Sequence, residues 1–255
     1  MKVLTTSLER KFKSYVPNRI KKFIVVFLCN KHLGKLIKKL CIRYNLFGGY
    51  FDYSLVSDVE AAHIFWGVWE SSEIRFSKRF IDCETIIELG SSVGVTLGVL
   101  AKKNQNKTFI CIEASNVNFE KLKILSYQLP KNNEYILINK AIAYGVDNVS
   151  FFHTSTTGSR ITDEISGEQQ YIAATTLKNI ISEYEVQNDF CLISDIEGAE
   201  SSIFFEDASS LQNCKTIVAD LEDTGSHTCE QQIAKLISVG FSVVERYANV
   251  VVMTR

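Results

Sequence analysis

The stretch that decides the fold is TIIELGSSVGVTLGVLAKK, residues 85–103, followed closely by TFICIEASNVNFEKLK, residues 108–123. Each begins with a short apolar run that ends in a carboxylate, Glu88 or Glu113, and then continues with a helical pattern. Glycines crowd the first junction. The two stretches predict two strand–helix units whose junctions face a common ligand.

From residue 84 onward, apolar runs typical of strands alternate with helical patterns. The predicted strands are 85–89, 108–113, 135–138, 190–195, 216–221, 241–246 and 249–253, and the predicted helices lie near 94–103, 116–127, 176–184, 199–210 and 228–239. Nearly all-apolar strands that alternate with helices indicate a parallel sheet covered on both faces. The ending FSVVERYANVVVMTR, residues 241–255, is typical of an antiparallel hairpin instead.

We therefore predict an α/β fold with a doubly wound, mostly parallel seven-stranded sheet and a C-terminal antiparallel hairpin. This is the Rossmann-like architecture of class I methyltransferases, whereas nicotinamide-binding folds usually end with another parallel strand. The 255 residues allow one large domain, expected at 81–255, and a basic helical N-terminal extension at 1–80.

The net charge of −1 hides a strong asymmetry. Residues 1–50 hold twelve Lys/Arg and one acid (12 − 1 = +11), and the remaining residues hold sixteen basic and twenty-eight acidic groups (16 − 28 = −12). Leu33, Leu36, Ile37 and Leu40 recur at helical spacing beside lysines, which predicts a basic amphipathic helix.

Three interpretations of this basic segment stay open: a helical layer packed on the main domain, docking on an anionic membrane surface through residues 1–45, and binding of nucleic acid. No recognised nucleic-acid module supports the third. The apolar run at 23–29 is too short to span a bilayer and has no cleavage site after it. We expect a cytoplasmic protein, with peripheral attachment to the inner membrane face as an option.

Seven cysteines, an odd number without CxxC spacing, are distributed along the chain, several of them inside apolar runs. We interpret them as reduced thiols that act as small core hydrophobes, which also indicates a cytosolic compartment.

The glycine loop and the second acid together predict the ligand. Gly90 and Gly94 allow close approach of the backbone, but their GxxxG spacing is not the dinucleotide fingerprint. Glu113, about 20 residues on, suits the two hydroxyls of a ribose, although a solvated strand-end acid is the alternative. Glu88 would orient the loop or face an ammonium group. Ribose at one end and an aminoacyl group at the other describe S-adenosylmethionine.

Further acids follow two later strands. In LISDIEGAESSIF, residues 192–204, Asp195 and Glu197 point to the same side, and Glu200 stabilises the start of the next helix. In VADLED, residues 218–223, Asp220 and Glu222 repeat the arrangement. Four carboxylates would converge if the strands are neighbours, and they could hold a divalent metal such as Mg²⁺. We predict no metal site.

The segments ELGSSVGVTL, CIEASNVNFEKLK, INKAIAYGVDNVSFFHT, AATTLKNII and LISDIEGAESSIF, in this order, resemble the FkbM family of S-adenosylmethionine-dependent methyltransferases. The resemblance covers about residues 84–222, and its most specific element is D-x-E-G-x-E at 195–200. It implies an O-methyltransferase that acts on a sugar hydroxyl in a glycan, polysaccharide or glycolipid precursor and releases S-adenosylhomocysteine.

The resemblance also implies the site residues. The predicted cofactor-binding residues are Glu88, Gly90, Ser91, Ser92 and Gly94 in the loop, Glu113 and Ala114 after the second strand, Ala141 and Ile142 beside the adenine, and Asp195 and Glu197. The family usually has Asp-x-Gly-Ala-Asn where this chain has residues 88–92, and Asp where Lys178 stands.

A base should accept the proton of the attacking hydroxyl. Asp195 is the first candidate and His227 the second, because its ordinary pKa is near neutral. In the segment HIFWGVWESSEIRF, residues 63–76, the aromatic residues either stack on a sugar ring or form the buried side of a lid helix, in which case Glu70 and Arg75 line the entrance; the aromatic residues are Phe65, Trp66 and Trp69. Two alternatives to a glycan methyltransferase stay open: a noncatalytic S-adenosylmethionine-binding scaffold and an RNA methyltransferase.

Overall fold

The computed structural model describes residue 25 and residues 27–153, 160–161 and 168–255. The chain divides into two compact units, which we call the N-terminal unit (1–46 and 52–69) and the sheet unit (47–51 and 70–255). The boundary expected at 80/81 stays a prediction. The helix at 71–80 groups with the sheet unit.

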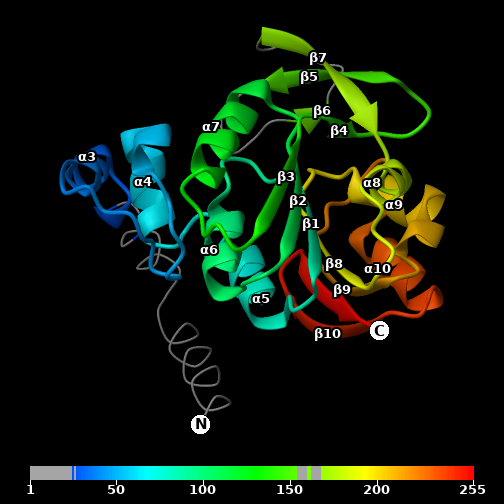
Figure 1. Ribbon diagram of the computed structural model, residues 1–255. Helices are drawn as coiled ribbons and strands as arrows, with labels where there is room; N and C mark the ends of the chain where they lie inside the picture. The colour runs from blue at the N-terminus through cyan, green and yellow to red at the C-terminus, as the bar shows by residue number, and fades with distance from the viewer. Residues whose placement is uncertain (1–24, 26, 154–159, 162–167) are drawn as a thin grey trace. The chain divides into compact units, whose positions relative to one another are not determined.

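A seven-stranded sheet forms the centre of the sheet unit (Figure 1). Its strands are β1 (Thr85–Leu89), β2 (Thr108–Ile112), β3 (Glu134–Ile138), β8 (Phe190–Ser194), β9 (Cys214–Asp220), β10 (Ser242–Tyr247) and β11 (Val250–Thr254), in the spatial order β10-β11-β9-β8-β1-β2-β3. The first five strands pair in parallel, and β11 is antiparallel to both β9 and β10. The predicted fold class, a doubly wound sheet closed by an antiparallel C-terminal hairpin, is confirmed.

Register aligns the carboxyl ends of four adjacent strands. Leu89 of β1 pairs with Ile112 of β2 and with Ser194 of β8, and Ser194 in turn pairs with Ala219 of β9. The residues that come next are Gly90, Glu113, Asp195 and Asp220. Ligands of doubly wound sheets bind beyond this end of the strands, where the strand order reverses. The residues predicted to share one ligand therefore do lie together at the carboxyl ends of adjacent strands of one sheet.

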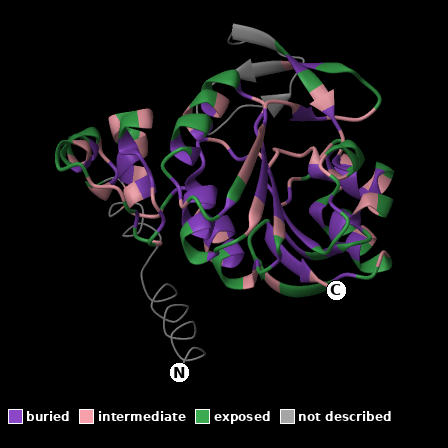
Figure 2. Cartoon of the chain, viewed as in Figure 1, coloured by how far each residue is buried: buried purple, intermediate pink, exposed green. Residues whose placement is uncertain are grey.

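Helices cover both faces of the sheet (Figure 1). One face carries α5 (Ser71–Phe80), α6 (Val95–Lys103) and α7 (Asn116–Ser126), and the other carries α8 (Leu177–Glu183), α9 (Glu200–Glu206) and α10 (Cys229–Ser238). The inner strands β1, β2, β8, β9 and β11 are buried almost throughout, whereas the edge strands β3 and β10 are more exposed (Figure 2). This double cover explains why the parallel strands consist of continuous apolar runs.

Residues 47–51 lie along α6. The Tyr50 N–H donates to the Gly98 carbonyl at 3.2 Å, and a Cβ at Gly98 would overlap the Tyr50 carbonyl oxygen. Gly49 is equally close to Val99. Gly48 has φ +81° and no atom within 4 Å of an added Cβ. The segment therefore includes both close backbone contacts and one open left-handed turn position.

A second sheet, of four strands, was not predicted. It consists of β4 (Ala141–Ile142), β5 (Asn148–His153), β6 (Arg160–Ile161) and β7 (Glu168–Thr175), in the order β4-β7-β5-β6. Its main ladder is antiparallel, from Asn148–Ala173 to His153–Glu168. The run EQQYIAAT of β7 is polar in its first half, so its strand conformation depends on pairing with β5 rather than on local hydrophobic pattern.

The N-terminal unit packs α3 (Lys31–Lys39) against α4 (Asp58–Phe65), with a short 3-10 helix at Tyr53–Leu55 between them. A capping box of Ser57 and Glu60 begins α4. Inside the N-terminal unit, the rings of Tyr53 and Phe65 pack edge to face, with 6.4 Å between their centroids. In the part of the chain that is described, no helix combines the length and apolar character needed to cross a bilayer.

The expectation that all seven cysteines are reduced thiols is wrong for two of them. A disulfide joins Cys83, just before β1, to Cys191 of β8, with their Cα atoms 5.7 Å apart. Because β1 and β8 are neighbouring strands, two cysteines 108 residues apart in sequence become adjacent. The inference of a cytosolic compartment from reduced thiols loses this support.

Candidate functional site

Gly90 is the turn residue at which β1 leaves the sheet. It has φ +81°, a left-handed conformation, and an added Cβ would overlap the carbonyl oxygen of Asp195. Its N–H donates to the Ile112 carbonyl at 2.9 Å, and the Asp195 N–H donates to the Leu89 carbonyl at 3.0 Å. Backbone contacts at this glycine thus join the ends of β1, β2 and β8.

Glu113 holds the loop after β1. One carboxylate oxygen accepts from the Ser92 N–H at 2.8 Å, and the other accepts from the Ser115 N–H at 2.7 Å. Ser92 has φ +48°, and Ser91 is buried with its hydroxyl donating to the Glu88 carbonyl at 3.2 Å. Each carboxylate oxygen keeps a second lone pair, so Glu113 can still accept hydrogen bonds from a diol.

Gly94 has a packing role. It has φ +83° at the start of α6, and an added Cβ would come within 2.7–2.8 Å of the side chains of Leu122 and Leu125 on α7. The left-handed φ favours glycine at this position, and the absence of a Cβ leaves room for the two leucine side chains. The GxxxG pattern therefore combines one turn residue at the sheet edge, Gly90, with one helix-packing residue.

The residues predicted to flank an adenine lie next to the end of β2. Ala141 and Ile142 form β4 and are buried, and Ala114 packs against the same small cluster as Ala141. Asn139, which sequence reasoning missed, donates to the carbonyls of Glu113 and Ala114 at 2.9 and 3.2 Å. Its position directly after the buried end of β3 was the available signal.

Glu200 fixes the loop that follows β8. It is completely buried and accepts from the N–H groups of Ile196 and Gly198 at 2.7 and 2.9 Å and from the Ser194 hydroxyl at 3.2 Å. Glu197 has φ +55° in this loop. The predicted role of Glu200 at the start of a helix is thus extended, because its carboxylate also holds the backbone that presents Asp195.

The carboxyl groups at the carboxyl ends of these strands have pKa values well above the ordinary range. Burial, followed by the charge of Glu70, raises the pKa of Glu88 to about 8. Burial raises the pKa of Glu113 to about 7, against the opposing effect of its two N–H donors. Burial and the charges of Glu70 and Glu200 raise the pKa of Asp195 well above its ordinary range. Such a desolvated acidic site favours a cationic ligand, which would stabilise the ionised carboxylates.

Glu73, on the buried face of α5, is a further member that sequence reasoning missed. Burial raises the pKa of its carboxyl group and that of the Asp220 carboxyl group, and the two groups interact with each other. One oxygen of Asp220 is buried and has no hydrogen-bond partner among the described residues. The signal available in the sequence was an acid at an apolar position of an amphipathic helix.

The four carboxylates expected to converge do belong to neighbouring strand ends, because β8 and β9 pair. Glu222 lies about 4.0 Å from the position of a Cβ on Gly198, and the charge of Glu197 acts on Asp220. Within the described residues, no three His, Cys, Asp or Glu side chains are grouped so as to hold a metal ion.

His227, the second predicted base, stacks on Phe205 of α9, with 3.6 Å between ring centroids. Its Nδ1 is buried without a hydrogen-bond partner in the described residues. His227 is not among the groups whose charge acts most strongly on Asp195, which are all carboxylates. Its catalytic role stays a prediction.

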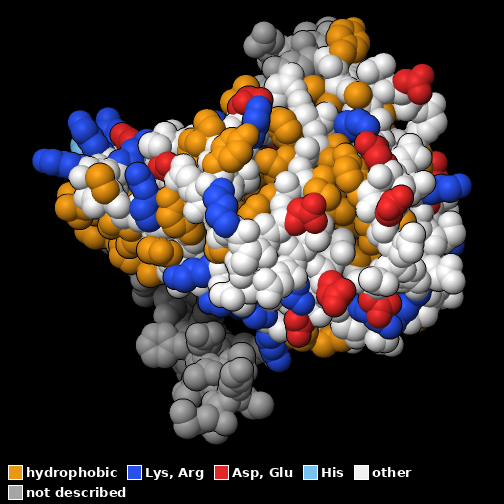
Figure 3. All heavy atoms as spheres, viewed as in Figure 1, with side chains coloured by type: hydrophobic (Ala, Val, Ile, Leu, Met, Phe, Trp, Pro, Cys, Tyr) orange, Lys and Arg blue, Asp and Glu red, His pale blue; other side chains and the backbone are white. Residues whose placement is uncertain are grey.

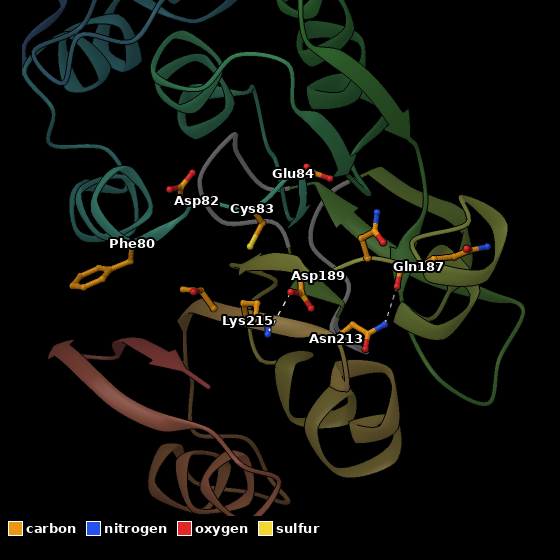
Figure 4. Close-up of a pocket in the computed structure, with 10 residues that line it drawn as sticks. Phe80, Asp82, Cys83, Glu84, Gln187, Asp189, Asn213 and Lys215 are labelled. Atoms are coloured by element: carbon orange, nitrogen blue, oxygen red, sulfur yellow. Dashed lines mark hydrogen bonds and ion pairs between the residues drawn. The ribbon is translucent and has the colours of Figure 1, made fainter.

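A polar pocket of about 580 Å³ opens at the opposite end of the same strands (Figure 4). Its lining comprises Phe80, Asp82, Cys83, Glu84, Gln187, Asn188, Asp189, Asn213, Lys215 and Thr216. Asp189 and Lys215 form an ion pair at 3.3 Å across it. Because it lies before the amino ends of β1, β8 and β9, it is separate from the carboxyl-end site, where ligands of such sheets bind.

The raised pKa of Glu88 predicts a pH-dependent stability. Unfolding lowers this pKa from about 8 toward 4.5, so the native state binds more protons than the unfolded state above pH 4.5. Stability should fall as pH rises through 8. Between pH 6 and pH 8, the Glu88 contribution to the free energy of unfolding should decrease by about 2 kcal/mol.

Denaturant unfolding at pH 6 and pH 8 measures the change in the free energy of unfolding. Glu88→Gln should lack the part of this change that comes from Glu88. The matched control is Glu84→Gln, at the exposed amino end of the same strand, which should leave the slope unchanged. Equal slopes for wild type and Glu88→Gln would contradict the prediction.

The known proteins that resemble this chain are similar in structure alone. No protein-family model matches the sequence, and no curated protein matches it. Solved structures of similar fold include the N-terminal domain of EvdMO1 with SAH bound (TM-score 0.45, 11% identity, 88% of this chain and 96% of that chain). A precorrin-6y C5,15-methyltransferase from Geobacter metallireducens GS-15 gives TM-score 0.42 and 11% identity over 73% of this chain and 89% of that chain.

A third, fibrillarin of Aeropyrum pernix in complex with natively bound S-adenosyl-L-methionine, gives TM-score 0.38 and 12% identity over 67% of this chain. The chain spans 65% of that fibrillarin's length. Likeness at this level assigns neither activity nor ligand to this chain, and the FkbM resemblance stays a prediction.

Proposed function

We propose that this protein is an S-adenosylmethionine-dependent O-methyltransferase of the FkbM type, and that it methylates a sugar hydroxyl in a glycan or glycolipid precursor. The observation that carries the proposal is the alignment of these residues at the carboxyl ends of adjacent strands. In a class I methyltransferase strand order, Gly90, Glu113 and Asp195 follow three adjacent strands in one register row.

The side chains at these strand ends suit the charge and shape of that cofactor. Its sulfonium and ammonium groups are cations, and a cation would favour the ionised forms of Glu88, which is buried, and Asp195, which is half-buried. Glu113 offers two carboxylate oxygens to the ribose hydroxyls, and Gly90 allows the ends of β1 and β8 to meet beside it. The proposal assigns Ala114, Ala141 and Ile142 to the adenine side.

S-adenosylmethionine supplies an electrophilic methyl group on a sulfonium when it is bound. Asp195 would accept the proton of the attacking sugar hydroxyl as the new oxygen–carbon bond forms and the sulfur–carbon bond breaks. Its raised pKa makes it a stronger base than an ordinary aspartate, and Glu200 holds the backbone that positions it. The products are a methyl ether and S-adenosylhomocysteine.

Calorimetry with S-adenosylmethionine and transfer of labelled methyl groups test the proposal. We expect Asp195→Asn to retain cofactor binding within about tenfold and to lose roughly 10²–10⁴-fold in methyl transfer. The matched control is Asp189→Asn, at the exposed amino end of β8, which should retain both. No heat of cofactor binding by the wild type would refute the cofactor assignment.

The acceptor is tested by incubating the protein and labelled cofactor with glycan, lipid and RNA fractions of a cell lysate. Label should enter the glycan or glycolipid fraction. Label in RNA would overturn the sugar acceptor and favour an RNA methyltransferase. Tight cofactor binding without transfer to any fraction would favour a noncatalytic scaffold.

A further inference from the structure

The outer surface of α3 in the N-terminal unit differs from that of an ordinary packed helix. Gly34 and Ile37 form its buried side, and a Cβ at Gly34 would overlap the carbonyl oxygen of Asp58 at the start of α4. The apolar pattern of the sequence predicts Leu36 and Leu40 on the same packed side. Instead, Leu36 is 47% exposed and Leu40 is 62% exposed.

These two leucines are one helical turn apart, so they lie next to each other on the helix surface. Phe27, shortly before the helix, is 65% exposed. Large apolar side chains that reach water side by side are typical of a surface that contacts a partner. The apolar stripe of α3 is therefore wider than its packing against α4 requires.

Lysines border this apolar surface. Lys31, Lys35 and Lys39 are exposed and recur every four residues, so they form one ridge along α3. Lys38 is different, because it turns inward to the Asp58 carboxylate at 2.9 Å and the Val56 carbonyl at 2.5 Å. The first turn of α3 contains no acid. Figure 3 shows hydrophobic and Lys/Arg side chains gathered over this part of the chain.

We infer that the exposed side of α3 docks on an anionic lipid surface, with Leu36 and Leu40 entering the interface and Lys31, Lys35 and Lys39 contacting headgroups. Two features on one helix support lipid over the other occupants. A helix that only caps the protein would not leave two leucines in water, and a nucleic acid would be attracted by the lysines but would not use the leucines.

The N-terminal sequence extends the positive charge. Residues 1–24 add seven Lys/Arg against one acid, Glu9. Each basic residue near an anionic bilayer contributes about 1 kcal/mol, which is about fivefold in partitioning. Removing the three ridge lysines should therefore weaken vesicle binding by on the order of 100-fold.

Flotation of the full-length protein with vesicles of phosphatidylcholine, alone or mixed with phosphatidylglycerol, tests this inference. We expect recovery with the mixed vesicles at about 0.1 M salt and its loss near 1 M salt. Lys31→Gln/Lys35→Gln/Lys39→Gln should reduce the partition coefficient by on the order of 100-fold. Leu36→Ser/Leu40→Ser should reduce it by roughly tenfold without changing the charge.

The matched control for charge is Lys123→Gln/Lys131→Gln/Lys178→Gln, which removes three exposed lysines from the sheet unit and should leave vesicle binding unchanged. Thermal unfolding of each variant checks that the fold is retained. Equal losses in both lysine triples would overturn the inference, as would equal recovery on neutral and mixed vesicles. Full binding by the leucine variant together with competition by RNA would also overturn it, in favour of a polyanion site.

Discussion

Replacing Gly90 with alanine should destabilise the protein by roughly 3–5 kcal/mol and abolish binding of S-adenosylmethionine. Two costs add at this position. A residue with a Cβ is strained at φ +81°, and the Cβ would overlap the carbonyl oxygen of Asp195, a backbone atom that cannot rotate away. Relieving this overlap requires the ends of β1 and β8 to separate. Their separation would displace Glu113 and Asp195 from their positions beside each other.

Gly48 is the matched control, because it has the same φ of +81° and nothing within 4 Å of an added Cβ. Gly48→Ala should cost about 1 kcal/mol, the conformational part alone, and leave cofactor binding intact. Denaturant unfolding gives the two free energies, and calorimetry gives the two affinities. Similar losses for both variants would show that the close approach to Asp195 is unimportant.

Breaking the link between Cys83 and Cys191 should lower the free energy of unfolding by about 4 kcal/mol, because the disulfide closes a loop across 108 residues of the unfolded chain. The oxidised, denatured protein should expose five titratable thiols and the reduced protein all seven cysteines. Reductant should therefore shift the unfolding midpoint of the wild type to lower denaturant.

Cys214→Ala is the control for Cys191→Ala. Both remove a buried sulfur from adjacent strands, β9 and β8, but Cys214 is a free thiol. The stability of Cys214→Ala should still fall on adding reductant, whereas Cys191→Ala should no longer respond. Seven thiols in the oxidised, denatured wild type would contradict the pairing.

Local sequence was sufficient for the elements of the central sheet. Apolar runs bounded by turn residues predicted all seven of its strands, and the hairpin at residues 241–255 distinguished this fold from one that ends in a parallel strand. The positions of Gly90, Glu113 and Asp195 directly after neighbouring strands were also predicted, whereas their contacts with a ligand stay a prediction.

Features that depend on pairing between distant segments could not be predicted from the sequence. The strand conformation of β7 depends on its ladder with β5, and the Cys83–Cys191 link depends on the adjacency of β1 and β8. Likewise, hydrophobic periodicity indicated that α3 is amphipathic, but it did not show how much of the apolar stripe α4 covers.

What the sequence determined by itself is the order of elements and the residues that end each strand, since propensity and periodicity act over a few neighbouring positions. Only the tertiary structure decided which of those ends meet. In the folded protein, Glu73 interacts with Asp220, and Gly94 lies against side chains of α7. Leu36 and Leu40 remain exposed to solvent. Such contacts join segments far apart in the chain, and burial and charge at each of them depend on the whole fold.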